Sequence, residues 1–248
     1  MEDFFQKLFD NNPQEAVDLF VNLHRLTLQS KPHIKKYNKL RKLHGEILDN
    51  MDDYLASGKL NTSYEFESLA KDISKETGQL DFFLDSSNPD DKTILIELFA
   101  YRNHPNITPL TEIYLKKSKF RNADKVKMLK SMNDSYASLF KVVDSDYENG
   151  YITYEDVFTK KKFKVVDISL STTFRKGYHV YMYNRIITCD GISFGTGMHI
   201  MMSDENKSLQ EYIKKGKYKN CSGFAKCIML YDISKKEKKI KTSYNERY

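Results

Sequence analysis

Apolar side chains recur at helical spacing through the first half of the chain. The clearest segment begins with Asn12 and Pro13, where asparagine can cap the first turn and proline suits the first helical position. Glu15 can complete a capping box with Asn12. Behind this start, Leu19 and Leu23 lie on one helical face. The pattern therefore predicts a helix that begins at Asn12.

Further segments of the first half repeat this periodicity, and most of them open with a proline or a capping side chain. They cover residues 32–58, 62–73, 90–102, 108–114 and 122–132. Four side chains of residues 90–102 are expected to face inward: Ile94, Leu95, Leu98 and Phe99. We therefore expect about six helices joined by short polar loops, which form a helical domain of residues 1–133.

The pattern changes at Ser135, where alternation with a period of two replaces helical spacing and β-branched and aromatic residues become frequent. The dipeptide Asn149-Gly150 lies between two such runs and suits a type I′ turn with positive φ angles. We therefore expect residues 136–144 and 151–158 to form a hairpin. The next three expected strands are residues 163–168, 178–188 and 192–202, with Asp190-Gly191 as a second tight-turn signal.

Helical spacing returns twice after the strands. Ser203 can cap a short helix that reaches Ile213, and residues 221–233 carry apolar side chains at helical spacing. The expected fold class is α+β, with a helical N-terminal half, a small five-stranded antiparallel β-barrel-like module and C-terminal helices. The β-module and the C-terminal helices are expected to form a second unit of residues 134–248.

Positive charge is concentrated near the C-terminal end. The net charge is +6, and residues 205–248 hold 12 Lys and Arg against 5 Asp and Glu. The rest of the chain is therefore close to neutral. A basic segment can attract phosphates or acidic surfaces, but a lysine-rich stretch such as residues 235–241 is more often only solvated. Since 40% of the residues are hydrophobic, the chain can bury a core, which excludes wholesale disorder.

The cysteine content favours a reducing compartment. Cys189, Cys221 and Cys227 are odd in number and lack the spacing of a disulfide framework. The first residues do not have a signal-peptide pattern, and no apolar run approaches the roughly 18 residues of a membrane span. We therefore expect a cytoplasmic protein without a membrane partner.

The sequence contains no motif with the spacing of a catalytic centre, metal site or cofactor site. The acidic turn of residues 144–152 resembles a calcium loop, but aligning Gly150 with the loop glycine puts Tyr147 at a ligand position. Cys221 and Cys227 lack the further Cys or His ligands of a structural zinc site. We therefore expect no catalytic residue, no metal and no cofactor.

The strand region also carries a resemblance to a known group of proteins. Its features are Phe140-Lys-Val-Val143 before an acidic turn, then Tyr154-Glu-Asp156, Val165-Val-Asp167, Ser169-Leu-Ser171, and Lys176-Gly177 before a strand with Arg185. In these features it resembles the β-module of uncharacterised bacterial proteins that often carry a SEC-C zinc motif. The clustered Cys and His residues of that motif are missing here. The resemblance therefore implies a fold and not an activity.

The fourth expected strand is the candidate binding face. Period-two alternation places Tyr181, Tyr183 and Arg185 on one side of it, and an exposed Tyr/Arg face on a sheet can stack bases and contact phosphates. Basic residues of neighbouring turns would add charge: Lys160, Lys161, Lys162, Arg175 and Lys176. The alternative is that the tyrosine rings cover adjacent helices.

These observations favour a non-enzymatic binding or adaptor protein whose β-module contacts nucleic acid or another protein. A second hypothesis is a metal-dependent hydrolase or nuclease built from distant acids such as Asp49, Asp52 and Asp53. Adjacent acids on a helix point in different directions, so solvation is the simpler account of this cluster. A third hypothesis is an accessory role in phage defence or in a mobile element, which the sequence neither supports nor excludes.

Overall fold

The described chain changes from helices to strands at Ser135, as the periodicity predicts. The structure is a computed structural model that describes residues 12–56, 75, 89–101, 108–117, 122–174, 180–216 and 221–236. Its helices are α2 (Pro13–Leu28), α3 (Pro32–Ala56), α5 (Pro89–Ala100), α6 (Leu110–Lys117), α7 (Ala123–Asn133), α8 (Ile168–Thr173), α9 (Lys207–Lys215) and α10 (Gly223–Lys236). The strands are β1 (Tyr136–Asp146), β2 (Tyr151–Asp156), β3 (Lys162–Val166), β4 (Val180–Cys189) and β5 (Ile192–Ser203).

The five strands close into a barrel in the order β1-β2-β3-β5-β4. Strand β1 serves both sides of the closure, since its first half pairs with β4 and its second half with β2. A register shift between Val142 and Asp144 bends β1, as a bulge allows. The mixed α+β class and the five mostly antiparallel strands are therefore confirmed.

One pair of strands departs from the antiparallel arrangement that we expected. β3 and β5 run parallel and meet at Val166 and Phe194. The reason is the connection through α8, which was not predicted and lies between β3 and β4. Because β4 and β5 form an antiparallel hairpin, β5 takes the direction of β3. Asp167 begins α8 by accepting a hydrogen bond from the Leu170 N–H at 2.9 Å.

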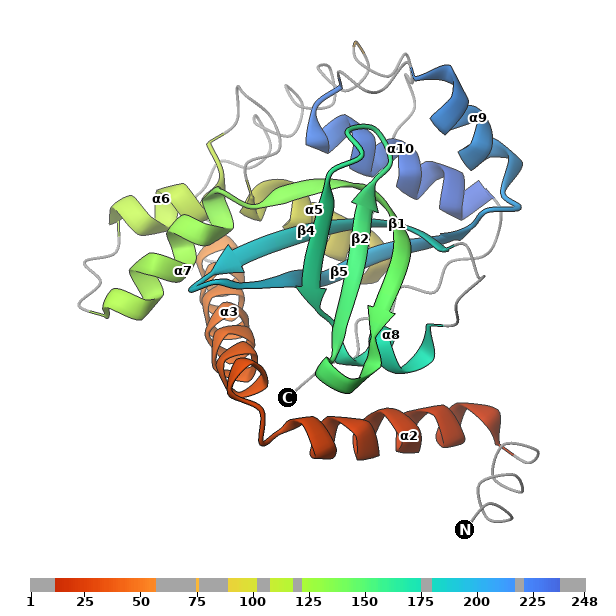
Figure 1. Cartoon of the computed structure of the whole chain (residues 1–248). Coiled ribbons are helices and arrows are strands. Elements are labelled where there is room, and N and C mark those ends of the chain that lie inside the picture. The colour runs from red at the N-terminus through yellow and green to blue at the C-terminus, as the bar shows by residue number, and fades with distance from the viewer. Residues whose placement is uncertain are drawn as a thin grey trace.

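The barrel interior is one hydrophobic cluster, and the helices cover much of its outside. The interior residues are Phe140, Val142, Ile152, Tyr154, Val165, Met182 and Ile186. Helices α5, α9 and α10 pack against β1, β4 and β5, whereas α3, α6 and α7 pack against β4, β5 and the end of β3. Figure 1 shows α3, α6 and α7 at the left of the barrel, with β1 and β2 toward the viewer. Hydrophobic contacts thus join residues on both sides of residue 133. The division into two domains at that residue stays a prediction.

The predicted Asn12 cap is confirmed, whereas the predicted Ser203 cap is wrong. The Asn12 side chain accepts a hydrogen bond from the Glu15 N–H at 3.3 Å and donates one to the Glu15 carboxylate at 2.9 Å. Asn122 caps α7 in the same way, through the N–H groups of Asp124 and Lys125. The helix starting at Ser203 begins later, with Asn206 as its cap. The helix predicted for residues 62–73 lies outside the described residues.

The type I′ conformation that we expected at Asn149-Gly150 occurs instead at the second turn, Asp190-Gly191. The hairpin at Asn149-Gly150 is present, but its type I′ turn is wrong: residues Tyr147–Asn149 form a 3₁₀ turn, and only Gly150 has a positive φ, of 69°. The Asp146 carboxylate accepts a hydrogen bond from the Asn149 N–H and so stabilises the 3₁₀ turn. Positive φ at both central residues occurs instead at Asp190 (53°) and Gly191 (75°), as type I′ requires.

Candidate functional site

The predicted Tyr/Arg face of β4 exists, but it is not exposed. Tyr183 is 0% exposed and Arg185 1% exposed, so the prediction that they form an open binding face is wrong. Tyr181 is half-buried and packs against the same core as α10. The face is covered because α5 and α10 pack onto it, which is the alternative that the aromatic residues left open. Arg175 and Lys176 lie outside the described residues.

Arg185 forms a buried ion pair with a residue that lies far away in the sequence. Its Nε donates to the Glu97 carboxylate at 2.5 Å, and its Nη1 donates to Ser135 Oγ at 3.0 Å. The guanidinium also lies 4.6 Å from the ring centroid of Tyr101. Burial raises the pKa of Glu97, whereas the charge of Arg185 and its hydrogen bond lower it. Burial by itself lowers the pKa of Arg185, and Glu97 restores it to above its usual value. Arg185 therefore connects β4 to α5 and compensates the buried charge of Glu97.

Two further buried groups adjoin this pair. His44 Nε2 lies 2.7 Å from the Tyr101 hydroxyl, and burial, with the charge of Arg41, lowers the pKa of His44 to about 3. Burial likewise raises the pKa of Cys227, whose thiol is 0% exposed. His44 is therefore neutral near pH 7, and the Cys227 thiol is protonated and poorly suited to nucleophilic attack.

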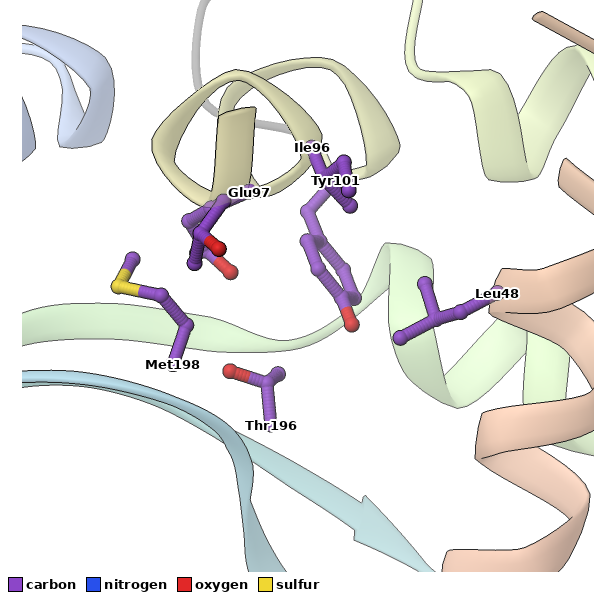
Figure 2. A pocket seen from close by; sticks show the side chains of 7 residues that line it. Leu48, Ile96, Glu97, Tyr101, Thr196 and Met198 are labelled. Atoms are coloured by element: carbon purple, nitrogen blue, oxygen red, sulfur yellow. The ribbon is translucent and has the colours of Figure 1, made fainter. Parts of the chain in front are cut away.

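A small pocket lies beside the ion pair. Its lining residues are Leu48, Thr93, Ile96, Glu97, Tyr101, Thr196 and Met198. Figure 2 shows the Glu97 carboxylate and the Thr196 hydroxyl facing the same space. The space is about 10 Å³, which is roughly what one water molecule needs. The described residues thus leave room here for water and not for a substrate. We name Glu97, Tyr101, Arg185 and His44 the buried polar cluster.

One residue of the buried polar cluster, Glu97, could have been recognised from the sequence. Glu97 is the only charged residue between Ile94 and Ala100 of a strongly apolar helix. A carboxylate on the buried face of such a helix needs a cationic partner. This predicts that some Arg or Lys is buried too, although not which one.

The lysines of the expected turn are exposed on the barrel. Lys160, Lys161 and Lys162 lie at the β2–β3 connection, where Lys160 has a positive φ of 63°. Lys160 and Lys162 each lie 4.0 Å from the Glu155 carboxylate. At this distance and exposure the ion pairs are weak, so all three lysines keep charge available to a ligand.

Sequence reasoning missed two residues of this surface, Lys164 on β3 and Tyr151 on β2. Lys164 is exposed, and its Nζ lies 4.4 Å from the ring centroid of Tyr151 on β2. Lys161 is placed similarly over Phe163, at 4.9 Å. The signal was the alternation Lys162-Phe163-Lys164, which directs the lysines outward and the phenylalanine inward. We name Tyr151, Lys160, Lys161, Lys162 and Lys164 the β2–β3 surface.

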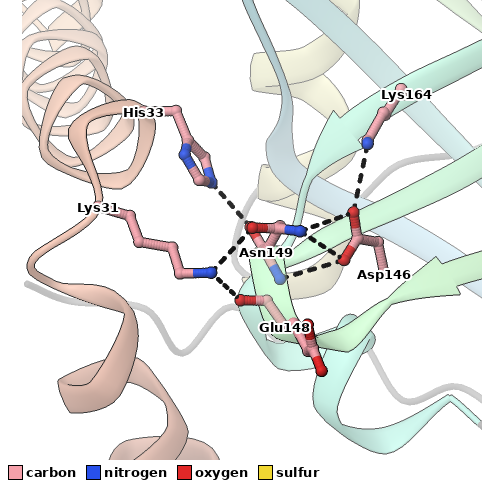
Figure 3. A network of polar contacts seen from close by, with 6 residues as sticks. All are labelled: Lys31, His33, Asp146, Glu148, Asn149 and Lys164. Atoms are coloured by element: carbon pink, nitrogen blue, oxygen red, sulfur yellow. Dashed lines mark hydrogen bonds and ion pairs between the residues drawn. The ribbon is translucent and has the colours of Figure 1, made fainter.

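The start of α3 docks at one end of the β2–β3 surface. Figure 3 shows Lys31 and His33 contacting the turn between β1 and β2. Lys31 donates to the Glu148 carbonyl and to Asn149 Oδ1, the latter at 2.8 Å, and His33 Nε2 lies 2.8 Å from the Asn149 carbonyl. The His33 ring also stacks on Tyr151, with 4.9 Å between centroids. Tyr151 therefore joins the β2–β3 surface to α3.

The acids of the second hypothesis are not brought together with other ligands. Asp49 and Asp53 are exposed on α3, and the Asp52 side chain lies outside the described part of the chain. Across the described ranges, no group of three or more His, Cys, Asp or Glu is placed to hold a metal ion. Within the same ranges, no helix is long and apolar enough to cross a membrane.

Comparison with known proteins places the chain in a family. A model described as a family of unknown function (DUF7986) matches residues 31–245. The chain belongs to this family. Comparisons with curated proteins and with solved structures give no match. The DUF7986 match begins immediately before α3 and includes both the buried polar cluster and the β2–β3 surface, whereas α2 precedes it. The resemblance to SEC-C-associated β-modules stays a prediction.

Proposed function

We propose that this DUF7986 chain is a non-enzymatic binding protein that binds single-stranded nucleic acid on its β2–β3 surface. The observation that carries the proposal is the row of exposed lysines Lys160, Lys161, Lys162 and Lys164 beside aromatic rings. Single-strand binders combine a positive track for the backbone with rings on which bases stack. The lysine ammonium groups provide the positive track. A base would stack on the half-buried ring of Tyr151 by displacing the Lys164 side chain, because His33 already covers the other face of that ring.

The topology of the barrel supports the same surface. A closed barrel in the order β1-β2-β3-β5-β4, with β3 parallel to β5 and a helix between β3 and β4, has the strand order of the OB-fold. Barrels of that type bind oligonucleotides or oligosaccharides across strands 2 and 3, between the loops that follow strands 1 and 4. Topology by itself does not establish a function. It adds weight because the exposed lysines lie on the third strand and on its connection to the second.

Nucleic acid is a better ligand for this surface than an oligosaccharide. Four exposed lysines can contact phosphates, Lys164 by exchanging the Asp146 carboxylate that lies 3.3 Å from its Nζ (Figure 3). Neutral sugars would not compensate this charge. The cytoplasmic location belongs to the same proposal. It is supported by Cys189 and Cys227, which are buried and form no disulfide in the described structure, as suits a reducing compartment.

The test is binding of fluorescent oligothymidine of about 16 nucleotides, the upper site size of an OB-fold, as a function of salt. The variant Lys162→Ala/Lys164→Ala should bind at least tenfold more weakly at low salt. Its plot of log Kd against log salt should be less steep by about 1.4, since each lost phosphate contact on a single strand removes about 0.7. The matched control is Lys207→Ala/Lys214→Ala, which removes two exposed lysines of α9.

The α9 control distinguishes binding at the β2–β3 surface from a general effect of net charge. The α9 variant should bind like the unmodified protein, because Lys207 and Lys214 lie on the exposed side of α9, opposite the buried Tyr212 ring that contacts Phe158 in the β2–β3 connection. Equal losses in both double variants would mean that only net charge matters. Unchanged affinity of the Lys162→Ala/Lys164→Ala variant would refute binding at the β2–β3 surface.

A further inference from the structure

The first half of α3 presents lysines on its outer face. Lys35, Lys39 and Lys42 are exposed and follow one another at i, i+4 and i+7, which places them on one side of a helix. Ile34 and Tyr37, on the other side, are buried in the cluster that includes β5. The helix therefore uses one side for the barrel and leaves a row of positive charges toward solvent. We name Lys35, Lys39 and Lys42 the α3 lysine row.

Helix stability does not account for this arrangement. The first turn of α3 holds no acidic residue, and the first acid along the helix is Glu46. Cations near a helix N-terminus oppose the helix dipole, and like charges at i, i+4 such as Lys35 and Lys39 repel each other. Both effects weaken the isolated helix, and a bound anion would relieve both.

The neighbouring elements hold the α3 helix in place but neutralise little of the charge of its lysine row. Lys39 pairs with Asp124 of α7 at 2.8 Å, but 71% of its side chain is still exposed. Within the described ranges, Lys35 and Lys42 have no acidic partner. Lys127 of α7 pairs with Asp190, and α7 packs beside α3 (Figure 1). The α3 backbone is therefore held against its neighbours, and the lysine side chains on its outer face stay exposed.

The position of α3 relates the row to the β2–β3 surface. Lys31 and His33 contact the turn between β1 and β2 (Figure 3). One turn further on, Lys36 Nζ donates to the Asp190 carbonyl in the turn between β4 and β5 at 2.5 Å. These are the two loops that flank the ligand in barrels of this topology. Helix α3 thus joins both loops, and the lysine row lies on the same helix as His33 and Lys36, which contact them.

We infer that the α3 lysine row binds the phosphate backbone of nucleic acid, as a second contact region that continues from the β2–β3 surface. This inference rests on the proposed function for its path, but it involves different residues. The row reads no bases, because each lysine is a point charge on a flexible chain that can contact any phosphate. Its contribution is therefore independent of sequence and requires a strand longer than the barrel face accommodates.

The experiment compares oligothymidines of about 16 and about 30 nucleotides, the shorter matching one OB-fold site. The unmodified protein should bind the longer strand more tightly, with a steeper salt dependence. The variant Lys35→Ala/Lys42→Ala should bind the shorter strand as before and lose the advantage for the longer one. Its salt slope on the longer strand should fall by about 1.4 for two lost contacts. Alanine suits an exposed helix position, so α3 should stay folded.

The outcomes separate this inference from the proposed function. If Lys35→Ala/Lys42→Ala binds both strands like the α9 control Lys207→Ala/Lys214→Ala, the lysine row makes no contact and the inference is overturned. If that variant loses affinity while the Lys162→Ala/Lys164→Ala variant does not, the β2–β3 surface fails and the lysine row stands. The inference is also overturned if the length advantage persists in the α3 variant.

Discussion

The buried pair of Glu97 and Arg185 yields the sharpest test of the fold, because removing one partner leaves a charge without compensation. Both side chains are at most 2% exposed, and their contact is 2.5 Å. Breaking a buried ion pair from one side typically costs about 3–5 kcal/mol, whereas replacing both partners with apolar side chains is often neutral or stabilising. Since a domain of this kind is stable by roughly 5–15 kcal/mol, the single loss is a large fraction of the total.

The substitutions are Glu97→Leu, Arg185→Met and the two combined. We expect Glu97→Leu to lower the free energy of unfolding by about 3–5 kcal/mol, because Arg185 is then buried without its carboxylate. Arg185→Met should cost less than Glu97→Leu, since a buried carboxyl can take up a proton, which an arginine cannot release. The double variant should regain at least about 2 kcal/mol relative to the sum of the single losses.

Urea unfolding followed by circular dichroism measures all three variants, with constant m-values as the check for two-state behaviour. The folded double variant should also bind oligothymidine like the unmodified protein, since the pair lies under α5 and away from the lysines. Additive single losses of under about 1 kcal/mol would show that the pair is solvated. Weaker binding by a stable double variant would show that Arg185 contributes to oligothymidine binding.

Two further predictions concern stability. His44 is buried with a pKa of about 3, so the unfolded chain, with a pKa near 6.5, takes up the proton first as the pH falls. Protonation of His44 in the unfolded chain should therefore lower the free energy of unfolding by about 2 kcal/mol between pH 7 and pH 5. His44→Gln should remove this part of the pH dependence in urea titrations. A pH profile identical to that of the unmodified protein would contradict the prediction. Gly150→Ala should cost more than Gly191→Ala by about 1 kcal/mol. Both glycines have positive φ, which costs an alanine about 1–2 kcal/mol at either position. Only at Gly150 would the added Cβ also lie 2.9 Å from Leu28 Cδ1. Equal losses of stability would mean that the Leu28 side chain moves aside at no cost.

Local signals predicted most of the elements because they act over only a few residues. Asn12 and Asn122 cap helices with their own side chains, and period-two alternation identified all five strands. Short-range chemistry also explains the errors. The turn at Asn149 changed type because Asp146 accepts its N–H, and α8 was missed because a helix of six residues is too short for a clear periodicity.

The binding face could be predicted only in part, for a different reason. Alternation correctly placed Tyr183 and Arg185 on the same side of β4, but it carries no information on what covers that side. The cover comes from α5, whose Glu97 lies 88 residues from Arg185. The lysines of the β2–β3 connection stayed exposed because the neighbouring helix α9 packs against Phe158 and leaves the lysine side chains in solvent.

The amino-acid sequence by itself therefore determined where helices and strands form, since caps, turns and side-chain periodicity depend on neighbours within about four residues. Only the tertiary structure decided which faces are buried, that β3 and β5 run parallel, and that α3 joins two distant turns. Those properties depend on closing the chain over long separations, where the partner of a side chain such as Arg185 is chosen by packing and by the need to compensate a buried charge.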